Sequence, residues 1–166
     1  MIRLARDTDL PVLQDIERAA GAPFRDHDMA AIADDQPPTI AELTEYQQDS
    51  RCWVVTDDQD HPIGYLLGAI IDGRAHVEQV SVHPGHSGHG HGRRLIDTLD
   101  AWATDRGLAG LTLTTFADIP WNAPYYERLG FRVLADHELT PGLRQVRAHE
   151  AERGLDAWPR VTMRRD

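Results

Sequence analysis

The sequence predicts a single α/β domain, and three observations lead to that prediction. An apolar run ending at Val82 passes through a turn containing Gly88, Gly90 and Gly92 into an amphipathic segment, as expected where a strand is followed by a helix. Segments with strand periodicity and segments with helix periodicity alternate along the chain. The length of 166 residues suits one hydrophobic core, because two cores would leave each half marginally stable. We therefore expect one domain over residues 1–166.

The first half of the chain predicts two main helices and three antiparallel strands. Thr39 and Glu42 form a capping-box pattern that opens the second helix. Residues 21–38 are expected to be irregular or partly helical, because Pro37 and Pro38 interrupt the chain. The expected elements, in order, are a strand at 2–6, a helix at 8–20, a helix at 39–48, a hairpin of strands at 51–56 and 62–71, and a strand at 75–82.

The second half predicts one crossover between parallel strands, followed by a mixed region. A helix follows the glycine-rich turn and ends at Gly107. The apolar stripe of this helix must face a sheet. Thr140 and Pro141 have the pattern of a helix start. The stripe consists of Leu95, Ile96, Leu99, Trp102 and Ala103. The expected elements after it are a strand at 111–116, a short helix at 122–129, a strand from 131 to 134, a helix from 140 to 154 and a last strand at 158–163.

Composition excludes several classes of protein. The formal net charge of −10 argues against a nucleic-acid partner, because neutralising phosphates needs clustered cations. No apolar run is long enough to span a membrane and the first residues lack a signal-peptide pattern, so we expect a cytoplasmic protein without a membrane partner. The single cysteine, Cys52, lies in an apolar run and is expected to be a buried structural residue.

The glycine-rich turn predicts an anion site suited to a pyrophosphate. Glycines let the chain turn tightly, so that successive N–H groups at a helix start can converge on an anion. A Walker A loop needs a lysine, and the chain contains none. The dinucleotide fingerprint G-x-G-x-x-G opens a first βαβ unit, whereas Gly88, Gly90 and Gly92 follow a G-x-G-x-G rhythm in the middle of the chain.

A second motif lies downstream, at residues 121–131. Gly130 suits the left-handed position that ends a short helix, and Phe131 starts the next apolar strand. With the glycine-rich turn, this segment resembles the motifs of the GNAT family of N-acetyltransferases. The matching positions are Ser87, Gly90 and Gly92 in the first motif and Asn122, Tyr126, Gly130 and Phe131 in the second. Ser87 departs from the family pattern, which has Gln or Arg there. A short hydroxyl cannot reach the pyrophosphate as those side chains can, so the contribution expected at this position comes from the backbone.

The resemblance is strong over roughly residues 50–135 and implies a fold and a cofactor. The implied fold is a mixed, mostly antiparallel sheet of six to seven strands with helices on both faces. The implied cosubstrate is acetyl-CoA, with its pantetheine arm between the strands at 75–82 and 111–116 and no metal. The implied cofactor-binding residues are Val80, Ser81, Val82, Ser87, Gly88, His89, Gly90, His91, Gly92, Arg93, Asn122 and Tyr125. Asn122 is expected to hydrogen-bond the pantetheine, with capping of its own helix as the alternative.

The resemblance also implies how an amine would be acylated. An amine with a pKa of about 10 must lose a proton before it attacks a thioester, so a base is required. Glu78 is the preferred base, with His76 as its partner or alternative. A backbone N–H of the strand, expected from Val80, would stabilise the oxyanion. Tyr126 matches the family tyrosine that donates a proton to the CoA sulfur, whereas the adjacent Tyr125 should point elsewhere.

Four histidines in and beside the glycine-rich turn raise a separate hypothesis. Such a cluster could bind zinc or nickel, but its spacing is loose and a metal would block the anion site. We expect the side chains to face solvent, where imidazolium charge beside a phosphate would make cofactor affinity depend on pH. The four residues are His83, His86, His89 and His91.

The function expected from this sequence is transfer of an acetyl group from acetyl-CoA to a primary amine of a small molecule or peptide, by direct attack in a ternary complex. The alternatives are a sensor that binds acetyl-CoA without turnover and an acyltransferase that uses a longer acyl-CoA. The acceptor is left open, because it depends on the variable segments at 21–50, 117–121 and 136–157. Trp121 and four acids are candidate contacts for a cationic amine, although ordinary surface roles are favoured for them. Those acids are Asp26, Asp28, Asp34 and Asp35. A homodimer is also compatible with the resemblance.

Overall fold

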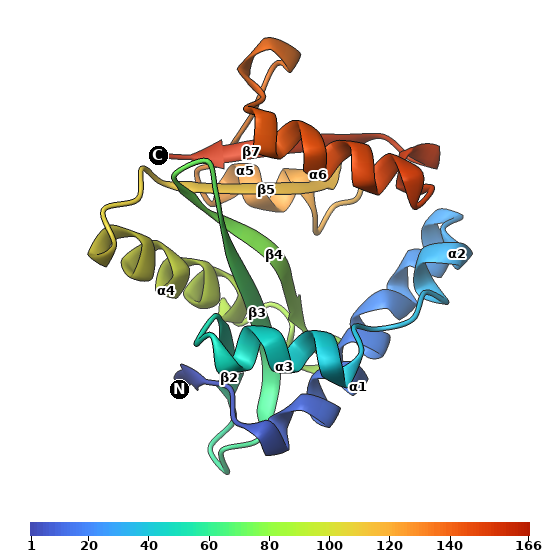
Figure 1. Ribbon diagram of the computed structural model, residues 1–166. Helices are drawn as coiled ribbons and strands as arrows, with labels where there is room; N and C mark the ends of the chain where they lie inside the picture. The colour runs from blue at the N-terminus through green and yellow to red at the C-terminus, as the bar shows by residue number, and fades with distance from the viewer. The chain divides into compact units, whose positions relative to one another are not determined.

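The computed structural model describes residues 1–166, with seven strands in the sheet order β1-β2-β3-β4-β5-β7-β6 (Figure 1). The strands are β1 (Ile2–Leu4), β2 (Cys52–Thr56), β3 (Pro62–Ile71), β4 (Arg74–Val82), β5 (Leu111–Phe116), β6 (Arg132–Val133) and β7 (Arg160–Arg165). The helices are α1 (Leu10–Gly21), α2 (Ala30–Ala33), α3 (Ile40–Gln48), α4 (His91–Asp105), α5 (Ala123–Arg128) and α6 (Pro141–Glu152). The mixed, mostly antiparallel sheet is therefore confirmed, with seven strands.

The chain divides into two compact units, and β3 and β4 contribute residues to both. The first unit consists of residues 1–68 and 78–98. In it, β1 pairs antiparallel with β2, and β2 pairs antiparallel with β3. The apolar faces of α1 and α3 cover β2 and β3 (Figure 1). The cluster that they bury includes Leu13, Ile16, Leu43, Cys52, Val54 and Tyr65.

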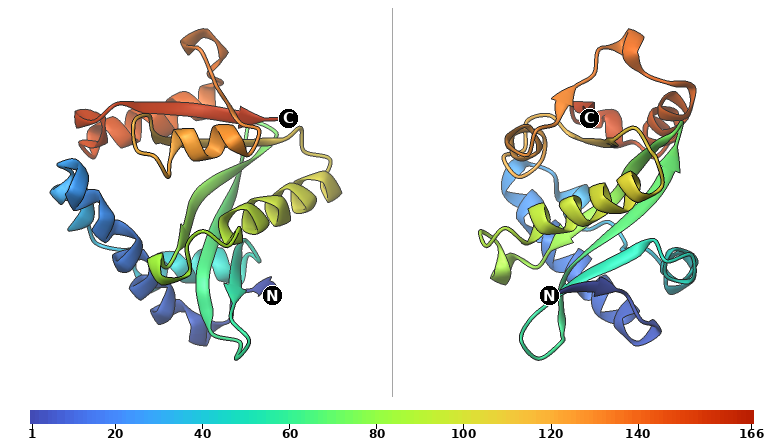
Figure 2. Two further views of the ribbon diagram at one scale, coloured as in Figure 1. Left: turned by 180° about the vertical axis from the view of Figure 1, so that it is seen from behind. Right: turned by 90° about the vertical axis from the view of Figure 1, so that its left-hand side faces the viewer.

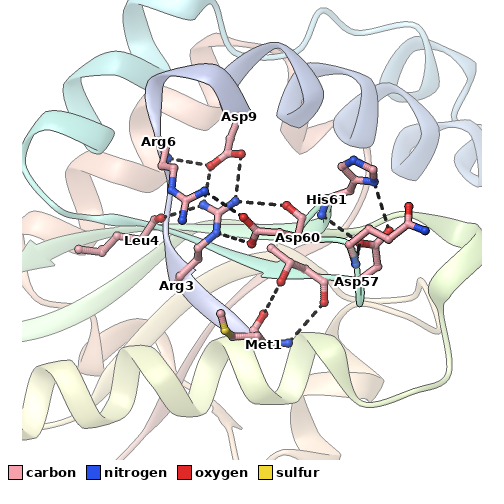
Figure 3. A network of polar contacts seen from close by, with 10 residues as sticks. Met1, Arg3, Leu4, Arg6, Asp9, Asp57, Asp60 and His61 are labelled. Carbon is pink, nitrogen blue, oxygen red and sulfur yellow. Dashed lines mark hydrogen bonds and ion pairs between the residues drawn. The ribbon is translucent and has the colours of Figure 1, made fainter.

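Ion pairs hold the beginning of the chain against the β2–β3 turn (Figure 3). The guanidinium of Arg3 lies 2.7 Å from one carboxylate oxygen of Asp9 and 2.9 Å from Asp60. The carboxylate of Asp9 also accepts the backbone N–H of Arg6 at 2.7 Å. Arg6 is the N-cap residue of a 3₁₀ helix over Asp7–Asp9, so β1 ends at Leu4 rather than at residue 6 as the sequence predicts.

The second unit consists of residues 69–77 and 99–166. Its strands β5 and β7 pair antiparallel along their full length, from Leu111 with Arg165 to Phe116 with Arg160. In both views of Figure 2, α5 and α6 lie on opposite faces of this pair. The strand β4 pairs parallel with β5 at Ala75 and His76, so the crossover through α4 is confirmed.

Local signals place most elements where the sequence predicts them. The Thr39 hydroxyl accepts the Glu42 N–H at 3.1 Å, and Thr140 caps α6 through the N–H of Leu143. Burial of Leu95, Ile96, Leu99 and Ala103 confirms the apolar stripe of α4. The last strand is shifted to Arg160–Arg165, because its register is set by pairing with β5 rather than by its own apolar residues.

Candidate active site

The glycine-rich turn leads directly into the N-terminus of α4. Gly88 and Gly90 have φ angles of 80° and 77°, which L side chains rarely adopt, and no atom lies within 4 Å of a Cβ built at either position. The Arg94 N–H donates to the Gly90 carbonyl at 3.1 Å, so it closes the first turn of the helix. The amides before it are those that a helix leaves without intrahelical partners. This turn therefore offers backbone donors and open space to an anion.

Side chains around the turn contribute less than its backbone. The Ser87 hydroxyl donates to the Pro84 carbonyl at 2.9 Å, which closes the turn locally. The rings of His89 and His91 lie 6.0 Å apart, and His91 contacts the guanidinium of Arg94. Burial and the positive charge of Arg94 lower the pKa of His91. Nowhere in the chain are three or more His, Cys, Asp or Glu side chains grouped as metal ligands.

The second half of β4 carries the candidate base on its surface. Glu78 is exposed, and its carboxylate adds to the effect of burial in raising the pKa of Tyr46 on α3. Val80 and Val82 are half-buried. Ser81 is 7% exposed, so its side chain points into the unit and only its backbone is suited to contact a cofactor.

A cluster of hydrogen-bonded side chains around Glu17, in the first unit, was not predicted from the sequence. Glu17 of α1 accepts hydrogen bonds from Tyr65 at 2.6 Å and from Ser81 at 2.7 Å. The Gln79 amide also donates to Glu17, at 3.1 Å. The signal for it was an acidic residue four positions after Leu13, where the helical period calls for an apolar side chain.

The second unit holds His76, the alternative base, in its interior. His76 is 2% exposed, and its Nδ1 lies 2.8 Å from the Thr112 hydroxyl on β5. Burial lowers the pKa of His76 from its ordinary 6.5 to about 4, against a smaller opposing effect of the Glu150 carboxylate. The imidazole is therefore neutral at pH 7 and bonded to a neighbouring strand.

This burial should make stability depend on pH. Between pH 6.5 and about 4 the unfolded chain protonates His76 and the folded chain does not, so the free energy of unfolding falls as pH is lowered through this window. The expected loss attributable to His76 is about 3 kcal/mol. Urea denaturation at several pH values measures the free energy of unfolding at each pH. Between pH 6.5 and about 4, this free energy should change less steeply with pH for His76→Asn than for the parent protein.

The control for this experiment is His137→Asn, which changes an exposed histidine of the same unit. It should keep the slope of the parent protein. An unchanged slope in His76→Asn would contradict the assignment of a buried, neutral His76.

The helix α5 carries the candidate acid. Tyr126 is 8% exposed, and its ring packs edge-on against Phe131 and Tyr125, with centroids 5.9 Å and 5.4 Å away. Tyr125 is half-buried, with the Arg128 guanidinium 5.7 Å above its ring. The two tyrosines therefore have different surroundings, as the helical period predicts.

Asn122 precedes α5, but its side chain does not cap the helix. Its backbone carbonyl accepts the Tyr126 N–H at 3.0 Å, whereas the side-chain Nδ2 donates to the Trp121 carbonyl at 3.2 Å. The side-chain Oδ1 is buried and has no hydrogen-bond partner. The alternative of capping is thus wrong, because no amide of α5 donates to the Asn122 side chain. The acceptor is left available to a ligand, since buried polar groups are seldom unpaired.

Comparison with known proteins identifies the family of the chain. A sequence model described as the acetyltransferase (GNAT) family matches residues 12–131. The chain belongs to the GNAT family. As a GNAT protein it is an N-acetyltransferase, and the matched residues include both the glycine-rich turn and the segment from Asn122 to Phe131.

Solved structures of other GNAT proteins share the fold. The chain is similar to the PaiA N-acetyltransferase of Thermoplasma acidophilum in complex with coenzyme A, at 14% identity and a TM-score of 0.72, covering 100% of this chain and 98% of that one. A GNAT acetyltransferase of Staphylococcus aureus has 13% identity and a TM-score of 0.74, with 99% and 97% covered. N-acetylglutamate synthase of Neisseria gonorrhoeae, complexed with coenzyme A and N-acetyl-glutamate, has 15% identity and a TM-score of 0.69, with 99% of this chain and 34% of that chain covered.

At these identities the solved structures bear on the fold of this GNAT protein and not on its substrate. Two of them hold coenzyme A. No helix of the chain combines the length and the apolar character needed to cross a bilayer.

Proposed function

We propose that this protein transfers an acetyl group from acetyl-CoA to a primary amine, by direct attack of the amine on the thioester in a ternary complex. The observation that carries the proposal is the glycine-rich turn, where two left-handed glycines at open positions precede the N-terminus of α4. Backbone amides without intrahelical partners, at the positive end of a helix dipole, suit the pyrophosphate of a coenzyme A thioester.

The base proposed for this reaction is Glu78. It is exposed on β4, so an incoming ammonium group can reach it, whereas the burial of His76 does not support His76 as the alternative. The base accepts a proton from the ammonium, and the neutral amine then attacks the thioester carbon. The backbone N–H of Val80 would stabilise the oxyanion that forms.

The proposed acid is Tyr126, which would protonate the CoA thiolate as it leaves. A phenol with a pKa of about 10 is still protonated at neutral pH and can donate that proton. The unpartnered Oδ1 of Asn122 supports a hydrogen bond to an N–H of the pantetheine arm. Because the family match includes residues of both compact units, we also propose that they act as one catalytic domain.

A calorimetric titration with acetyl-CoA tests this function, with ATP and NAD as controls. We expect binding of acetyl-CoA alone, in the micromolar range. Gly90→Ala should weaken it about tenfold or more, because an L residue at this φ is strained by about 1–2 kcal/mol and its Cβ enters the space offered to the phosphates.

The matched control is Gly73→Ala, which has the same left-handed backbone, with φ of 80° and no atom within 4 Å of its Cβ, but lies in the β3–β4 turn. It should lower stability by a similar amount and leave acetyl-CoA binding unchanged. Absence of acetyl-CoA binding by the parent protein would refute the proposed function.

A further inference from the structure

Glu17 is a carboxylate held in place entirely by neutral donors. The Tyr65 hydroxyl donates to its Oε2 at 2.6 Å and the Ser81 hydroxyl at 2.7 Å. The Gln79 amide donates to Oε1 at 3.1 Å and, more weakly, to Oε2 at 3.4 Å. Gln79 also donates to the Ser81 hydroxyl at 3.0 Å, so the donors orient one another. Three side chains from two strands therefore fix one negative charge.

Two more deeply buried carboxylates of the chain, Asp9 and Glu150, are paired with arginine. Asp9, with an 8% exposed side chain, faces Arg3, and Glu150, with a 13% exposed side chain, faces Arg147 and Arg160. Glu17 is half-buried and forms no ion pair. Removing a carboxylate from water without a countercharge is costly. A ligand with a positive charge would supply the countercharge that the protein does not.

The carboxylate has room for one more donor. A carboxylate accepts about four hydrogen bonds, two at each oxygen. The Oε2 atom is already occupied by Tyr65 and Ser81, whereas Oε1 accepts a single bond, from Gln79. Burial and the Glu17 carboxylate raise the pKa of Tyr65 well above its ordinary value, so its hydroxyl keeps its proton and stays a donor. The open position at Oε1 is thus preorganised for a cation.

The donors place this carboxylate beside the strand on which the reaction is proposed to occur. Gln79 and Ser81 flank Val80 in β4, whose backbone N–H is proposed to stabilise the oxyanion. We propose that Glu17 binds a second cationic group of the acceptor, so that the substrate is a diamine or another amine carrying a second positive charge. This inference rests on the proposed function, in which Glu78 receives the reacting amine.

The test compares α,ω-diamines, from 1,4-diaminobutane to its longer homologues, with monoamines of the same chain length. With the parent protein, CoA release should give a kcat/KM at least about tenfold higher for the best diamine than for its monoamine, as expected for one charge-assisted hydrogen bond. Glu17→Gln should lower the diamine value to the monoamine level, mainly through KM. It should leave the monoamine value and the affinity for acetyl-CoA unchanged.

The control variant is Asp15→Asn, which removes one negative charge from an exposed position of the same helix. It should keep the preference for diamines. Equal kcat/KM for diamines and monoamines would overturn the inference, and so would an equal loss for both in Glu17→Gln, because that result is expected of a structural residue.

A second measurement separates this inference from the proposed function. Calorimetric titration of the parent protein and Glu17→Gln with the same diamines reports binding without turnover. If no amine releases CoA and acetyl-CoA does not bind, the proposed function fails, and diamine binding that depends on Glu17 still supports the cation site. If acetyl-CoA binds and the diamines do not, the inference about Glu17 fails alone.

Discussion

Replacing Tyr126 by phenylalanine is expected to lower kcat by about 10²–10⁴-fold, the range that general acid catalysis contributes. The ring packs against Phe131 and Tyr125 at 5.9 Å and 5.4 Å between centroids, and phenylalanine keeps these contacts. The affinity for acetyl-CoA should therefore change little, whereas the thiolate loses its proton donor. Steady-state kinetics with a turned-over amine, together with calorimetry, measures both quantities.

Tyr125→Phe is the matched control, because it removes a hydroxyl from the neighbouring residue of the same helix. It should retain kcat within a few-fold of the parent. A Tyr126→Phe protein with unchanged kcat would show that another group protonates the leaving thiolate, and one with reduced acetyl-CoA affinity alone would show that the hydroxyl binds rather than donates the proton.

Glu150→Ala is expected to lower the free energy of unfolding by about 3–5 kcal/mol, as breaking a buried ion pair does. The Glu150 carboxylate lies 2.8 Å from Arg147 and 2.9 Å from Arg160, and it accepts the Thr114 hydroxyl at 2.6 Å. The Arg160 side chain is only 7% exposed. The variant would therefore leave its guanidinium buried without the carboxylate that now lies 2.9 Å away. Urea denaturation of the two proteins measures the difference.

The same ion-pair network around Glu150 predicts that the free energy of unfolding depends on pH. Burial alone would raise the pKa of Glu150, but the charge of Arg160 and the hydrogen bonds from Thr114 and Arg147 outweigh it and lower the pKa. The stabilisation is therefore complete above the pKa of the unfolded glutamate and is lost as pH falls through the lower folded value. Glu150→Ala should lack this acid-dependent loss.

Glu152→Gln serves as the control, since it changes an exposed glutamate of the same helix. It should be within about 0.5 kcal/mol of the parent, as surface substitutions usually are. A loss for Glu150→Ala no larger than this would mean that the network is compensated elsewhere and contributes little to stability.

Features that depend on neighbours in the chain could be predicted from the sequence. The capping pair Thr39 and Glu42 act within one helical turn, and the left-handed turns at Gly88 and Gly90 depend on the backbone freedom of single residues. The apolar stripe of α4 follows from the helical period. These local signals were sufficient for the order of the elements, the glycine-rich turn and the family.

Features that depend on partners distant in the chain were decided only by the tertiary structure. His76 could be a surface base or a core residue until β5 placed Thr112 at 2.8 Å from its ring. The hydrogen bonds that Glu17 in α1 accepts come from donors 48 to 64 residues away. The register of β7 was likewise set by its pairing with β5. Sequence alone determined the local backbone and the motifs, whereas hydrogen bonding and desolvation by distant residues decided which polar side chains are buried, charged or available to a ligand.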